Sequence, residues 1–69
     1  MGKALDSQVG GNHYKLPIQP VEFIYKNKLD YLRGNVIKYV TRKKNGAEDI
    51  RKAIHYCELL LELEYAHKD

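Results

Sequence analysis

Apolar residues recur with helical spacing along most of this 69-residue chain, beginning directly after Pro20. Val21, Ile24 and Tyr25 lie at i, i+3 and i+4, which places them on one side of a helix. Proline is favoured as the first residue of a helix because the N–H that it lacks has no helical partner there. The pattern therefore predicts a short first helix that begins at Pro20 and ends near Lys28.

A second helix is expected from Tyr31 to Lys44, with the side chain of Asp30 as its N-cap. Its apolar positions keep the helical period and are Leu29, Leu32, Val36, Ile37 and Val40. Gly34 interrupts this helix, and an interior glycine costs about 1 kcal/mol relative to alanine. We therefore expect either another helix or a ligand to approach the backbone at Gly34.

Asn45 and Gly46 indicate a helix stop and a tight connection to a third helix, from about Ala47 to Ala66. This third helix has two apolar stripes. The first consists of Ile50, Ala53, Ile54, Cys57, Leu60 and Leu61, and the second of Tyr56, Leu59 and Leu63. Two short partner helices can cover one stripe but hardly both. Because exposed apolar strips usually mark interfaces, the second stripe predicts self-association.

These elements predict a mainly α fold in one small domain, residues 1–69. A short N-terminal arm (1–16), flexible or extended, is followed by a helical core (20–66) of three helices. The last two helices are expected to form an antiparallel helical hairpin, and the chain is expected to be oligomeric, at least a dimer.

The arm contains a run of residues for which a globular core has little use. It consists of Gly10, Gly11, Asn12, His13, Tyr14 and Lys15. The two glycines let the backbone turn tightly and expose consecutive N–H groups, and polar, aromatic and basic side chains follow at once. Such a segment suits an anion attached to a flat ring, which describes a nucleotide, and we expect it to cover the ligand. The alternative is an ordinary Gly-Gly turn leading into a helix.

Composition narrows the classes of function. Twelve Lys and Arg against nine Asp and Glu give a formal net charge of +3, which favours phosphate ligands but is small for a dedicated DNA-binding protein. A single cysteine, Cys57, fits a reducing compartment, and no apolar run approaches the roughly 20 residues of a membrane span. A cytoplasmic protein is therefore expected. His13, His55 and His67 are scattered, and neither a metal site nor a cofactor is expected.

Basic side chains at helical spacing are the candidates for phosphate binding. Lys38 and Arg42 lie one turn apart on the side of the second helix that also carries Asn35. Arg51 and His55 repeat the i, i+4 spacing on the third helix. The planar guanidinium group of arginine suits phosphate oxygens in particular.

Tyr39 and Tyr56 are candidates for stacking on a base. The alternative is a solvated basic face with its tyrosines in the core. Glu48 and Asp49 are adjacent and therefore diverge around a helix, so we interpret them as charges favoured at a helix N-terminus rather than as magnesium ligands. No catalytic residue is assigned.

Four blocks of sequence, in order, carry a resemblance to a known family: residues 9–15, 17–20 with 22–24, 34–42 and 48–56. In these blocks the chain resembles small phage proteins catalogued as domain of unknown function 3310. That family is similar to a larger phage kinase that acts on deoxynucleoside monophosphates without a Walker motif. The resemblance implies ligand-binding roles for Asn12, His13, Tyr14, Lys15, Asn35, Lys38 and Arg42.

Two classes of function follow from the residues and the resemblance together. The first is a phage nucleotide-binding protein, an oligomer that acts as a sponge for nucleotides or nucleotide-derived host defence signals in pockets between subunits. The second is a deoxynucleoside monophosphate kinase that supplies phage DNA synthesis. Binding requires only groups that the sequence displays, so we favour it over catalysis. DNA binding through the second and third helices is a weaker alternative, because the end of the third helix is acidic.

Overall fold

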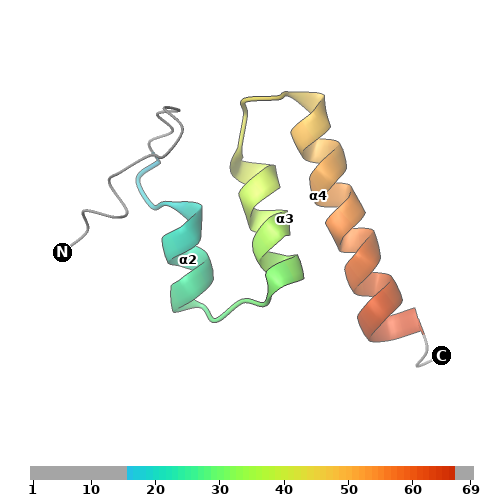
Figure 1. Cartoon of the computed structure of the whole chain (residues 1–69). Coiled ribbons are helices and arrows are strands. Elements are labelled where there is room, and N and C mark those ends of the chain that lie inside the picture. The colour runs from blue at the N-terminus through green and yellow to red at the C-terminus, as the bar shows by residue number, and fades with distance from the viewer. Residues whose placement is uncertain (1–15, 67–69) are drawn as a thin grey trace.

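The computed structural model describes residues 16–66, and within them three α-helices lie side by side (Figure 1). They are α2 (Pro20–Lys26), α3 (Tyr31–Thr41) and α4 (Ala47–Leu60), and α4 continues into a π-helical turn, η1 (Leu61–Tyr65). No strand occurs in this part of the chain. The expectation of a mainly α fold is confirmed. The predicted N-terminal arm, apart from residue 16, lies outside the described residues.

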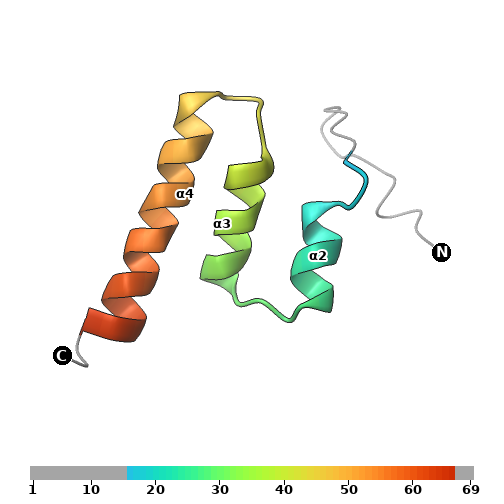
Figure 2. The same cartoon turned by 180° about the vertical axis from the view of Figure 1, so that it is seen from behind.

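The middle helix, α3, packs against α2 on one side and against α4 on the other. Successive helices run antiparallel, so the two connections lie at opposite ends of the row (Figures 1 and 2). The predicted antiparallel hairpin is therefore the pair α3–α4. Within residues 16–66, no further element covers either broad face of this row of three helices.

The helix starts follow the expected signals. Pro20 occupies the first turn of α2, and the backbone N–H of Arg33 donates to Oδ1 of Asp30 at 2.8 Å, which confirms Asp30 as the N-cap of α3. Gly46 precedes α4 with a φ of 58°, in the left-handed region that glycine adopts without strain.

The helix ends differ from expectation. α2 ends at Lys26, because the chain closes it with a left-handed residue, Lys28, at a φ of 55°. Lys28 N–H donates to the Tyr25 carbonyl at 3.1 Å, and Leu29 N–H donates to the Ile24 carbonyl at 3.0 Å. These two bonds form a Schellman motif, with lysine at the position that glycine usually occupies.

α3 ends at Thr41, three residues before the predicted Lys44. Arg42 is extended, with φ −83° and ψ 141°, so its side chain can reach the start of α4. The Thr41 hydroxyl lies 2.8 Å from the Ile37 carbonyl and 3.2 Å from the Lys38 carbonyl, and the Lys38 carbonyl is one of the last four acceptors of the helix.

Gly34 is buried where α2 crosses α3. A Cβ built on Gly34 would lie 3.2 Å from Cγ2 of Ile24, closer than side chains normally approach. Of the two expectations for this glycine, the approach of another helix is confirmed.

The hydrophobic core is small. Among the described residues, Ala53 is the one hydrophobic residue that is buried. The two apolar stripes of α4 do not divide into one core stripe and one outer stripe as expected. Tyr56 and Leu59 of the second stripe are half-buried, whereas Ile50 and Ile54 of the first are 45% and 52% exposed.

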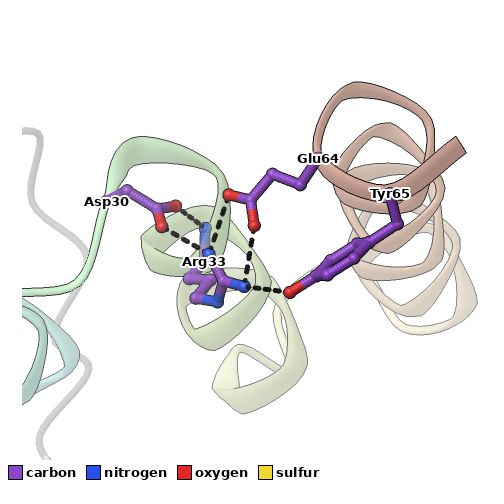
Figure 3. A network of polar contacts seen from close by, with 4 residues as sticks. All are labelled: Asp30, Arg33, Glu64 and Tyr65. Carbon is purple, nitrogen blue, oxygen red and sulfur yellow. Dashed lines mark hydrogen bonds and ion pairs between the residues drawn. The ribbon is translucent and has the colours of Figure 1, made fainter. Parts of the chain in front are cut away.

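Arg33 connects the start of α3 to η1 (Figure 3). Its guanidinium group donates to Asp30 at 2.6 Å, to both carboxylate oxygens of Glu64 at 3.0 and 3.1 Å, and to the Tyr65 hydroxyl at 3.3 Å. The hydrogen bonds to Glu64 and Asp30 raise the pKa of Arg33 above its ordinary value. Bidentate pairing fixes direction as well as distance, so this network sets how η1, and with it α4, lies against α3.

Candidate functional site

Three cationic side chains from two helices gather around the ring of Tyr39. Lys38 Nζ lies 5.1 Å from the ring centroid, Arg42 Cζ 4.9 Å, and Lys52 Nζ 5.3 Å. Each distance is within the range of a cation–π contact. We call this group, together with Tyr56, the Tyr39 cluster. Cations placed so close together repel one another, so an anion that lies among them is stabilised.

The cluster rests on stacked tyrosines that hold α3 against α4. The Tyr39 and Tyr56 rings are stacked, with centroids 5.9 Å apart and an interplanar angle of 10°. Tyr31 and His55 both meet Tyr56 edge-on, at 6.3 and 5.8 Å. A hydrogen bond with Tyr31, burial and the neighbouring phenols raise the pKa of Tyr56. Its phenol therefore stays neutral at physiological pH and adds no charge that would repel an anion.

Arg42 has a second partner, the carboxylate of Asp49. Asp49 is fully buried at the start of α4; its Oδ1 accepts from Nε of Arg42 at 3.2 Å and lies 3.1 Å from Nη2 of the same guanidinium group. Its Oδ2 accepts from the backbone N–H of Asn45 at 3.0 Å. The interpretation of Asp49 as a charge at a helix N-terminus agrees with this position, and the carboxylate in addition closes the α3–α4 connection.

Burial pushes the pKa of Asp49 upward, but the Asn45 backbone N–H and the Arg42 guanidinium together outweigh it and leave the pKa below 3.8. The carboxylate is therefore ionised at neutral pH, and it neutralises much of the charge of Arg42. The cationic character of the Tyr39 cluster consequently rests mainly on its two lysines.

Those lysines differ in their surroundings. Lys52 Nζ lies 3.7 Å from Glu48, a long contact between exposed groups that contributes little. Lys38 forms no ion pair with any residue in the described range 16–66. Lys38 is therefore the cation of the cluster best able to take a new anionic partner.

Beside the cluster, α2 and α3 enclose a hollow of about 440 Å³. Its lining is mostly apolar, and it includes Gln19, Ile24, Leu29, Gly34, Asn35 and Lys38. Small-molecule sites typically occupy about 300–1,000 Å³ and combine apolar walls with a few polar groups. Asn35 Nδ2 already donates to the Tyr31 carbonyl at 3.1 Å, so its acceptor oxygen is the group it can offer to a ligand.

The structure thus brings together some of the predicted site residues. Lys38, Tyr39 and Arg42 meet in the cluster, and Asn35 joins Lys38 along the hollow. His55 reaches the cluster only through the edge of Tyr56. The remaining predicted residues, Asn12, His13, Tyr14 and Lys15, lie outside the described range.

Arg51 is not brought to the cluster. It precedes the buried Ala53 by two positions, a rotation of about 200° on a helix, so it lies on the side of α4 remote from α3. Lys52 was missed by sequence reasoning, because the ring that it contacts, Tyr39, belongs to a different helix.

No helix within residues 16–66 has the length and apolar character to cross a membrane. In the same range, no cluster of three or more His, Cys, Asp or Glu side chains could bind a metal ion.

One comparison with known proteins gives a match. The model of a family described as a protein of unknown function, DUF3310, matches residues 9–58. No curated protein and no solved structure matches the chain.

Proposed function

This chain belongs to the DUF3310 family, and we propose that it is a nucleotide-binding protein. In this proposal the Tyr39 cluster binds the phosphate of the ligand, and the hollow between α2 and α3 receives its base. The two parts have the contrasting chemistry that a nucleotide requires, since the cluster is cationic and the lining of the hollow is mostly apolar with a few polar side chains, Asn35 among them.

The observation that carries the proposal is the position of Lys38. This side chain lies over the Tyr39 ring and also lines the hollow, so a ligand that fills the hollow has its charged end within reach of the cluster. The ion pair between Arg42 and Asp49 supports the same arrangement, because it keeps the Arg42 guanidinium 4.9 Å from the Tyr39 ring centroid.

The use that we propose for this binding is sequestration of nucleotides or of nucleotide-derived defence signals during phage infection. Sequestration requires a site that binds the phosphate of the ligand and releases the ligand chemically unchanged. The alternative, a deoxynucleoside monophosphate kinase, would use the same phosphate contacts but would return a nucleoside diphosphate.

Calorimetric titration of the protein with dTMP, dAMP, ATP and cyclic dinucleotides tests the proposal. At least one of these probes is expected to bind, and Lys38→Ala should weaken that binding about tenfold or more, the value of one charge-assisted contact to phosphate. Lys26→Ala is the matched control, because Lys26 is an exposed lysine on α2 that pairs with Glu22 and lies outside the cluster.

Incubation of the bound nucleotide with ATP and magnesium separates the two uses. Recovery of the nucleotide unchanged supports sequestration, and its conversion to a diphosphate supports the kinase. If none of the probes binds, or if Lys38→Ala and Lys26→Ala bind equally well, the site proposed here is wrong.

A further inference from the structure

A regular apolar stripe runs along α4 and onto the first residue of η1, on a face that the α3 contact leaves open. Ile50, Ile54 and Leu61 are 45%, 52% and 62% exposed, and Cys57 between them is exposed as well. Their spacing of four, three and four residues is the spacing of core positions in a two-helix coiled coil. Over these positions the stripe is about 16 Å long, at 1.5 Å per residue.

Charges beside the stripe are arranged with opposite signs at its two ends. Arg51 lies beside the stripe near its first residue, and Glu58 lies beside it on the same flank near its last. Both side chains are exposed, and neither forms an ion pair with any residue of the described part of the chain. On the opposite flank, the corresponding positions are Ala53 and Leu60, which face α3 and carry no charge.

From this arrangement we infer that α4 pairs with α4 of a second copy of this chain, antiparallel and about a two-fold axis. In an antiparallel pair, equivalent flanks of the two helices face each other. The axis passes midway between Ile54 and Cys57, so Ile50 contacts Leu61 of the partner subunit. On the flank, Arg51 pairs with Glu58 of the partner subunit, and the two-fold axis generates a second, equivalent ion pair. A parallel pair places Arg51 beside an uncharged flank and leaves both charges without partners.

The apolar surface also extends beyond α4, which favours a second copy of the chain over a small ligand. Cys57 and Leu60 border a shallow hollow of about 270 Å³ together with Leu29, Val36 and Ile37 of the α3 side. Val40, at the far end of α3, is 51% exposed. An isologous contact lets each copy cover this surface of the other at the same time.

This inference is independent of the proposed nucleotide site. On a helix, Lys52 lies about 180° from the middle of the stripe, so pairing through α4 leaves both Tyr39 clusters accessible. A dimer can therefore form whether or not the cluster binds nucleotides, and the two proposals can fail separately.

Sedimentation analysis across the micromolar range, combined with charge reversal, tests the pairing. The parent protein should sediment as a dimer, and Arg51→Glu should weaken dimerisation about tenfold or more, because it places two carboxylates opposite each other at two symmetric positions. Adding Glu58→Arg to Arg51→Glu should restore the parent affinity, a rescue that a change in folding alone would not produce.

A substitution in the apolar stripe, with a matched control, completes the test. Ile54→Asp should give a folded monomer with a helical circular dichroism spectrum, whereas Ile18→Asp, at an isoleucine that is 62% exposed and precedes α2, should leave the dimer intact. A short bismaleimide should link two copies through Cys57, which lies beside the axis. A monomeric parent protein, or a charge reversal that the second reversal does not rescue, would overturn the antiparallel pairing.

Discussion

At the scale of single residues, one buried carboxylate organises the connection between α3 and α4. Asp49 is fully buried and receives donors from Arg42 and from the Asn45 backbone. A buried carboxylate without partners would destabilise the fold, so each of these donors stabilises the buried charge. The position of Arg42 over the Tyr39 ring is a consequence of that pairing.

We expect Asp49→Asn to lower the thermal midpoint at pH 7 by at least about 5 °C, because the amide leaves Arg42 without its counter-charge and turns a donor toward another donor. The pKa of Asp49 is depressed below 3.8, so its stabilisation is complete above that pH and is lost as the pH falls through the folded-state pKa. The difference between parent and variant should therefore shrink below pH 4.

Thermal unfolding followed by circular dichroism between pH 3 and pH 7 measures this difference. Glu48→Gln is the control, since Glu48 is the adjacent carboxylate but its side chain is 64% exposed. If the two variants lose the same stability at pH 7, Asp49 does not organise the connection.

Some of these residues could be predicted from sequence and others could not. Asp30 and Lys38 depend on local spacing, which a helical period reveals directly. The pairing of Arg33 with Glu64 could not be predicted, because Glu64 is 31 residues away and only the packing of two helices brings it near. The place of Lys52 in the cluster could not be predicted, because it depends on a contact with Tyr39, a residue of a different helix.

At the scale of elements, the starts of the helices can be predicted from the local sequence better than their ends can. The starts of α2 and α3 coincide with Pro20 and Asp30, whose side chains act on the turn in which they occur. The end of α2 depends on Lys28 in a left-handed conformation, which no property of lysine favours. The end of α3 depends on a contact with Asp49 in the next helix, so its position follows from tertiary structure.

Lys28→Gly should stabilise the protein by about 0.5–1 kcal/mol, because glycine removes the cost of the left-handed conformation and loses only part of that gain to greater freedom in the unfolded chain. Urea unfolding measures the change. Lys26→Gly, two residues earlier and inside α2, should have the opposite effect, since glycine is unfavourable in a helix. Equal destabilisation by both substitutions would contradict the Schellman end of α2.

At the scale of the whole molecule, a row of three helices buries little. Ala53 is the one buried hydrophobic residue among those described, while several large apolar side chains of α4 and η1 remain more than 40% exposed. A chain of about 60–70 residues has little stability to spare even with a closed core. The two apolar stripes of the third helix predicted that part of its apolar surface would stay exposed. The exposed face is centred on Ile54 rather than on Tyr56, because Tyr56 stacks on Tyr39.

Pairing of α4 couples folding to protein concentration. We expect the thermal midpoint to rise by about 3–5 °C for a tenfold increase in protein concentration. Ile54→Asp should unfold at a lower temperature, with a midpoint that no longer depends on concentration. A concentration-independent midpoint in the parent protein would show that its folding is not coupled to assembly.

The contacts around Asp49 also bear on the order in which the chain folds. They join residues that are no more than seven positions apart, so the loop that they close costs little chain entropy. The α3–α4 hairpin can therefore form early and quickly, as structures with local contacts do. The long-range bonds from Arg33 to Glu64 close the far end of the same hairpin. We expect these long-range bonds to form last, after α3 and α4 have paired from the Asp49 end. The Arg33–Glu64 end of the hairpin should then be the first to open when the protein begins to unfold.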